Sequence, residues 1–272
     1  MTNFTKYIAC VLQVSLCSTA IFAGNAFAGT MGPIQENDWM KNLYIGVDGG
    51  YSASLNSTNF SPYTNTNIGN YGSVISVPGN TTFQHDIGNS GMVGGFLGYK
   101  VNENLSFNVN YDYRGWFNWQ VPTNASLSSG INGLLYYTND ISIQTLLFNF
   151  VLTPNKNLES LGNLRPYITG GIGMAFNNVG TVTSVNLLET SSYNNINGAS
   201  LTSFAWTVGI GAEYMITKNI TYTLGYRFVD AGSLETSNTL YNSTGTYEIN
   251  PFKANQVLLN EIITGLKWQF NV

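Results

Sequence analysis

The chain has 272 residues and a formal net charge of −4, and only 9% of its residues are charged, whereas glycine (29 residues) and aromatic residues (14%) are frequent. So little charge is unusual for a protein that must stay dispersed in water. The acidic balance and the lack of a basic patch exclude a nucleic-acid partner.

The first 28 residues have the features of a secretory signal peptide. Lys6 precedes an apolar run over residues 7–22, and an A-x-A cleavage sequence follows at residues 26–28. Cleavage would remove both cysteines, Cys10 and Cys17, and leave 9 basic against 14 acidic residues. A chain without thiols has no disulfide, zinc-thiolate site or cysteine nucleophile, and we predict neither a metal nor a cofactor.

A polar tail over residues 29–42, predicted to be periplasmic, leads into a barrel domain over residues 43–272. In this domain eight segments alternate with period two, as β-strands do. The cleanest is 105–114, where apolar residues from Leu105 to Tyr113 alternate with polar residues from Ser106 to Arg114. The eight predicted strands are 43–53, 92–101, 105–114, 141–152, 165–176, 204–216, 220–228 and 261–270.

Long and short connections alternate between these strands. The long ones, at 56–90, 115–140, 177–202 and 231–255, are rich in Asn, Ser, Thr and Gly, and the short ones are 102–104, 153–164 and 217–219. One face of each strand is apolar and the other is small or polar. A soluble sandwich or lipocalin-like barrel is the alternative, but a narrow face of Gly and Thr favours the inside of a membrane barrel. We therefore predict an all-β fold, an eight-stranded antiparallel transmembrane β-barrel with four long external loops and three short periplasmic turns.

The positions of the charged residues are an independent test of which strand face points inward, because the charges were not used to assign the faces. An Arg or Lys that faces lipid at mid-depth costs about 2 to 4 kcal/mol, so strand charges should point inward. In a lumen this narrow they should pair, with Arg227 near Glu213 or Glu261. The alternative is a gate whose pairs exchange to pass small ions. The predicted lumen charge network is Asp48, Lys100, Asp112, Arg114, Glu213, Arg227, Glu261 and Lys267.

Aromatic residues near the strand ends are typical of the interfacial belts of membrane proteins. The predicted interfacial aromatic anchors are Trp39, Trp116, Trp119, Trp206, Trp268 and Phe270.

The mature chain resembles the eight-stranded barrels similar to the transmembrane domain of outer membrane protein A and to the opacity-type surface proteins. The matching segments are Arg165-Pro-Tyr-Ile-Thr-Gly-Gly-Ile-Gly, Trp206-Thr-Val-Gly-Ile-Gly-Ala-Glu-Tyr, Leu224-Gly-Tyr-Arg-Phe and Gly265-Leu-Lys-Trp-Gln-Phe270. The resemblance implies a structural, adhesive or weakly channel-forming protein. The sequence differs from the family pattern in two respects. It shows no peptidoglycan-binding domain, and Asn271 and Val272 follow the aromatic residue Phe270, where the family usually ends on the aromatic residue.

These observations predict an integral protein of the outer membrane that contacts lipid and lipopolysaccharide and, during biogenesis, the barrel assembly machinery. The loops are polar and long enough to bind a host or cell-surface ligand, so adhesion is the predicted function and a small gated porin-like ion channel is the alternative. Catalysis is not expected, because the single histidine, His85, lies beside Asp86 in a loop and not in a strand. The sequence Gly170-Gly-Ile-Gly173 lacks the Lys-Ser/Thr of a phosphate-binding loop.

Overall fold

The computed structural model describes residues 40–55, 60, 75–76, 86–125, 134–154, 163–186, 192–243 and 245–270. The predicted signal peptide, most of the predicted periplasmic tail, Trp39 and His85 lie outside these ranges. A 3-10 turn, η1 (Met40–Asn42), leads into the first strand. In the part of the chain that the structure describes, no helix is long and apolar enough to cross a membrane.

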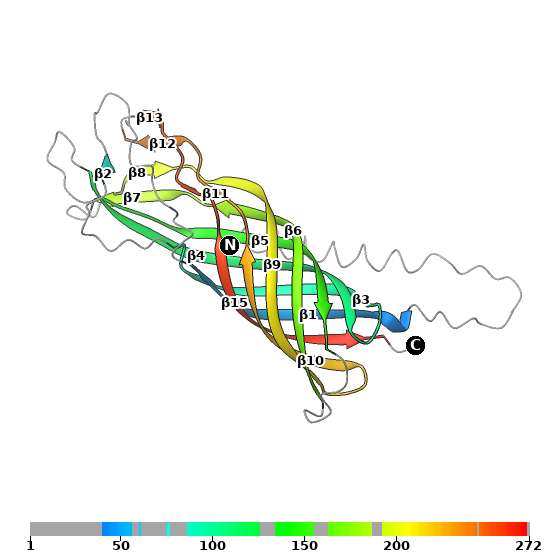
Figure 1. Cartoon of the computed structure of the whole chain (residues 1–272). Helices are drawn as coiled ribbons and strands as arrows, with labels where there is room; N and C mark the ends of the chain where they lie inside the picture. Colours follow the sequence, from blue (N-terminus) through cyan, green and yellow to red (C-terminus); the bar gives the residue numbers. More distant parts are fainter. Residues whose placement is uncertain are drawn as a thin grey trace, which may run out of the picture. The chain divides into compact units, whose positions relative to one another are not determined.

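Eight long strands pair into a closed antiparallel barrel (Figure 1). Each strand pairs with the next along the chain, β15 pairs back onto β1, and the β4–β5 ladder is part of the same ring. This confirms the predicted eight-stranded barrel. The barrel strands are β1 (Leu43–Ser54), β3 (Asn89–Lys100), β4 (Leu105–Ala125), β5 (Leu134–Leu152), β6 (Leu164–Val179), β9 (Ala199–Met215), β10 (Ile220–Asp230) and β15 (Leu258–Gln269).

Apolar side chains form the outer surface of the barrel, as the alternation predicts. Val47, Val93 and Ile262 are 60–63% exposed, whereas inward neighbours such as Ser52 and Asn110 are buried. Strand β3 is the most demanding test of the alternation, because Met92 and Phe96, which are predicted to face inward, are apolar like the outward residues. The structure places Met92 inside at 5% exposure and Val93 outside, which is the predicted phase.

Glycines on the lumen face make room for inward aromatic rings. A Cβ atom built on Gly98 would lie 2.1 Å from the ring of Tyr44, and one on Gly46 would lie 2.2 Å from the ring of Phe96. The tyrosine hydroxyl then donates a hydrogen bond of 3.1 Å to the carbonyl of Phe107 on β4. These rings fill a lumen that is only wide enough for side chains.

The long connections differ from the prediction, because strands extend into them. β4 has 21 residues and β5 has 19, so together they cover most of the predicted loop 115–140. The segments predicted as loops 177–202 and 231–255 form hairpins that extend the same sheet in the order β5-β7-β8-β12-β13, which we call the external sheet. Its short strands and their neighbours are β2 (Ile75–Ser76), β7 (Val182–Asn186), β8 (Ser192–Ile196), β11 (Leu234–Glu235), β12 (Thr239–Asn242), β13 (Gly245–Glu248) and β14 (Lys253–Ala254).

An irregularity in β4 explains why the sequence pattern ended that strand too early. Trp116 has a φ of 63°, and the β4–β5 register shifts between Arg114 and Phe117 and again between Phe117 and Trp119. One additional residue in a strand reverses which side chains face inward. Asn110, Asp112 and Arg114 are buried before Trp116, at even-numbered positions, whereas Phe117 and Trp119 are buried after it, at odd-numbered positions.

Candidate functional site

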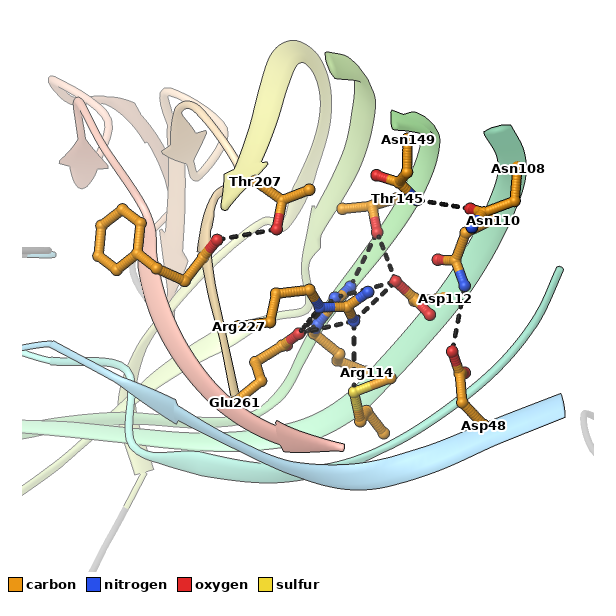
Figure 2. Close-up of polar contacts among 12 residues, drawn as sticks. Asp48, Asn108, Asn110, Asp112, Arg114, Thr145, Asn149, Thr207, Arg227 and Glu261 are labelled. Atoms are coloured by element: carbon orange, nitrogen blue, oxygen red, sulfur yellow. Dashed lines mark hydrogen bonds and ion pairs between the residues drawn. The ribbon is translucent and has the colours of Figure 1, made fainter. Parts of the chain in front are cut away.

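Four buried charged side chains meet near the middle of the lumen, and we call them the central charge cluster (Figure 2). Arg114 donates from Nε to Glu261 Oε1 and from Nη2 to Glu261 Oε2 at 3.1 Å. Arg227 Nε donates to Glu261 Oε2 at 2.7 Å, and its Nη2 lies 2.9 Å from Asp112 Oδ2. Two cations and two anions therefore balance, with side-chain exposures of 0–5%.

The strand register brings these residues together. Arg227 on β10 lies directly opposite Glu261 on β15, and Asp112 and Arg114 are two residues apart on the inward face of β4. Of the two partners predicted for Arg227, the structure selects Glu261.

Neutral groups add hydrogen bonds to the central charge cluster. Thr145 Oγ1 accepts from Arg114 Nη1 at 3.1 Å and donates to Asp112 Oδ2 at 3.4 Å. Met92 Sδ accepts from Arg227 Nη2 at 3.5 Å. Buried ion pairs offset their desolvation only when such additional bonds are made, so the arrangement links five strands, β3, β4, β5, β10 and β15, in a fixed geometry.

Asp48 lies beside the cluster but outside its ion pairs. Its Oδ2 accepts from Asn110 Nδ2 at 3.2 Å. Its Oδ1 and the Oδ1 of Asp112 are both buried and meet no hydrogen-bond donor among the described residues. Both of these oxygen atoms lie over Gly94 on β3, 2.3 Å from where a Cβ atom of that residue would be.

Gly94→Ala should therefore destabilise the barrel by about 1 to 3 kcal/mol, because overpacking would displace the Asp112 carboxylate, which Arg114 and Arg227 hold in place, and the neighbouring Asp48 carboxylate. Urea unfolding of the protein in detergent micelles measures the loss. Gly91→Ala is the matched control on the same strand, since a Cβ atom there meets nothing within 4 Å. Equal stability of the two variants would contradict this interpretation of Gly94.

The remaining predicted lumen charges lie closer to the short-turn end of the barrel. Lys267 Nζ donates to Glu213 at 2.5 Å and lies 5.2 Å from the centre of the Tyr44 ring. Glu213 thus pairs with Lys267 and not with Arg227. Lys100, the last residue of β3, lines the same region, so the predicted network divides into two groups at different depths.

Apolar side chains fill the barrel on the loop side of the central charge cluster. Trp119 is 1% exposed, with its ring centre 4.8 Å from that of Phe60 and 5.9 Å from that of Phe252. The prediction that Trp119 is an interfacial anchor is therefore wrong: the phase reversal at Trp116 turns its side chain inward. This apolar plug comprises residues from barrel strands and long connections, among them Phe60, Ile87, Phe117, Trp119, Ile141, Ile143, Val229, Leu234, Phe252 and Leu259.

The other aromatic residues predicted as anchors occupy varied environments. Trp116 and Trp268 are 71% and 56% exposed on the barrel exterior. Trp206 is half-buried and donates from its indole nitrogen to Asp230 Oδ2 at 3.2 Å, and Phe270 is also half-buried. Their anchoring role stays a prediction.

Among the described residues, small cavities in the lumen lie on the short-turn side of the apolar plug. One, of about 80 Å³, reaches from Tyr44 and Lys267 to Arg227. The other, of about 50 Å³, opens among the short turns. Within the described ranges, no group of three or more His, Cys, Asp and Glu side chains could hold a metal ion.

A closed antiparallel barrel with an apolar exterior and paired charges inside is the architecture of integral β-barrels of the outer membrane. The family model of the OmpA-like transmembrane domain matches residues 35–253, and the chain belongs to that family. It is an integral outer-membrane protein, with short periplasmic turns and long external connections.

The chain is also similar to parts or all of several individual proteins. The outer membrane protein PagN of Salmonella typhimurium is 35% identical over 79 residues, which cover 28% of this chain and 30% of PagN. Neisserial surface protein A is 15% identical, with 84% of this chain and 97% of that chain covered and a TM-score of 0.44. A major outer membrane protein of Thermus thermophilus is 10% identical, with 84% and 99% covered and a TM-score of 0.45.

Proposed function

We propose that the protein is a non-enzymatic surface protein that adheres to host or neighbouring cell surfaces through its external segments. The observation that carries this proposal is the ordered extension of the barrel beyond the membrane. A transmembrane strand needs about 9–11 residues, whereas β4 has 21 and β5 has 19. At about 3.3 Å per residue, the additional ten residues extend roughly 30 Å along the strands.

The external sheet is attached to the barrel by apolar packing. Leu240 on β12 and Ile196 on β8 are 0–1% exposed, and both belong to the same buried cluster as Trp119. A surface fixed in this way has little conformational entropy to lose when it binds, which favours affinity.

The exposed residues of the external sheet offer hydrogen bonding more than charge. Thr246, Glu248 and Asn250 are exposed at or beside β13, and Glu248 accepts from Asn238 at 3.1 Å. Lys253, a cation of this region, lies 3.9 Å from Glu235. Such a surface is better suited to a ligand rich in hydroxyl and amide groups than to a polyanion.

Bacteria that display the protein should adhere to cultured epithelial cells through this surface. Replacing Thr246, Glu248 and Asn250 together with alanine should lower adhesion by about fivefold or more, because interface side chains with large effects each contribute about 1 kcal/mol or more. Counting of adherent cells measures the effect, and self-aggregation of the bacteria tests attachment to neighbouring cells.

The matched control replaces two exposed residues of the periplasmic turns, Glu103→Ala and Lys218→Ala, and should leave adhesion unchanged. Heat-modifiable migration on gels establishes that each variant is folded. Unchanged adhesion and aggregation in the folded external variant would contradict the proposal.

A further inference from the structure

The cavity among the short turns is lined by more positive than negative side chains. Lys100 on β3, Arg165 on β6, Lys218 in the turn after β9 and Lys267 on β15 line it, together with the carboxylates of Glu103 and Glu213. The four cations come from separate parts of the barrel, and three of them stand on strands that the barrel holds in place. Strand pairing therefore keeps the backbones of Lys100, Arg165 and Lys267 around the cavity.

The carboxylates compensate these cations only in part. Glu213 bonds directly to Lys267 at 2.5 Å, and Arg165 lies opposite Glu213 in the β6–β9 register. Among the described residues, neither Lys100 nor Arg165 makes a hydrogen bond or an ion pair with another side chain. The positive charges of Arg165 and Lys267 act on Lys100 and oppose its own charge, whereas Glu103 and Glu213 attract it. The cavity thus retains a net positive field.

The cavity also offers neutral hydrogen-bonding groups. Asn163, Ser106 and Thr221 line the same space as the cations. A guanidinium group with its planar set of donors binds carboxylate or phosphate through two parallel hydrogen bonds, and ammonium groups add point charges. The central charge cluster offers no comparable site, because its two cations and two anions are mutually paired.

We propose that this periplasmic cavity binds a small oxyanion, a phosphate or carboxylate group that enters from the periplasm, between Lys100, Arg165 and Lys267. Glu213 competes there with the bound anion, because its carboxylate already neutralises part of the positive charge through Lys267. The site is independent of the adhesive surface, which lies at the opposite end of the barrel. Sodium phosphate and sodium acetate are the probes that show whether the cavity binds a phosphate group or a carboxylate group.

The test is isothermal titration of the full mature protein in nanodiscs of zwitterionic lipid with each anion at constant ionic strength. We expect saturable phosphate or acetate binding with a Kd of about 1 mM. The double variant Lys100→Gln/Arg165→Gln should bind the anion about tenfold or more weakly. The Glu213→Gln variant should bind it severalfold more tightly, because a competing carboxylate is removed. Lys253→Gln, at the external end, should bind like the parent protein.

Absence of saturable binding of both anions up to about 100 mM, or equal binding by the parent and the double variant, would overturn the proposal. If the double variant does not fold, Lys100→Gln alone replaces it. A folded Glu213→Gln variant that binds no tighter than the parent would also overturn the proposal, because a merely structural salt bridge would not compete with the ligand.

Discussion

Replacing Glu261 with alanine is expected to lower the free energy of unfolding by about 3 to 5 kcal/mol, because removing one partner of a buried ion network leaves uncompensated charge. Glu261 receives hydrogen bonds from both Arg114 and Arg227 and is 0% exposed. Without it, two guanidinium groups share the single carboxylate of Asp112. Unfolding by guanidinium chloride in detergent micelles measures the change.

Glu248→Ala is the control for removal of a carboxylate, since Glu248 is exposed on β13. Glu261→Gln separates charge from hydrogen bonding: it keeps an acceptor for the arginines but removes the negative charge, so its stability should lie between that of the parent and that of Glu261→Ala. A Glu261→Ala variant as stable as Glu248→Ala would show that the central charge cluster does not contribute to stability.

The same variant tests the channel alternative in planar bilayers. Opening the central charge cluster should not by itself allow ions to pass, because the apolar plug fills the lumen beside it on the loop side. We therefore expect the parent and Glu261→Ala to be silent. Stable openings in folded, inserted Glu261→Ala would contradict this expectation and favour a gated channel.

Replacing Trp119 with alanine should cost about 3 to 5 kcal/mol, because it leaves a large cavity in the apolar plug. The ring lies between Phe60 and Phe252, so its loss would weaken the packing of two long connections on the barrel. Unfolding monitored by circular dichroism measures the stability, and protease sensitivity of the external segments reports their detachment.

Two substitutions serve as controls for this effect. Trp116→Ala removes a tryptophan from the same strand that is 71% exposed, and should cost much less. Trp119→Phe should cost less than about 1.5 kcal/mol, because the indole N–H meets no acceptor among the described residues and an aromatic ring is retained. Similar losses for Trp119→Ala and Trp116→Ala would contradict the inward position of Trp119.

The barrel could be predicted from the sequence because a bilayer enforces a period-two pattern on every strand. The segregation of Asp112, Arg114, Arg227 and Glu261 to one face followed from the same constraint. Which of these residues pair with one another could not be predicted from the alternation. Arg114 and Glu261 are 147 positions apart, and only the closure of the barrel and the stagger of its strands bring them into contact.

The apolar plug and the external sheet were missed for a different reason. Counting alternation assumes an unbroken strand, but the bulge at Trp116 reverses the phase, so Trp119 reads as outward although it is buried. The remaining plug residues, such as Phe60 and Phe252, are isolated in Asn-, Ser- and Thr-rich connections. Short strands without a long apolar run resemble loops in sequence.

The apolar plug has a consequence for how the protein can change over time. Inward residues such as Leu240 and Phe252 hold the external segments on the barrel, whereas their exposed neighbours, such as Thr246, carry no packing. Substitutions at the exposed positions leave the frame intact and alter only the chemistry of the outer surface. A barrel built in this way can replace its outer chemistry residue by residue and still insert, fold and persist in the membrane.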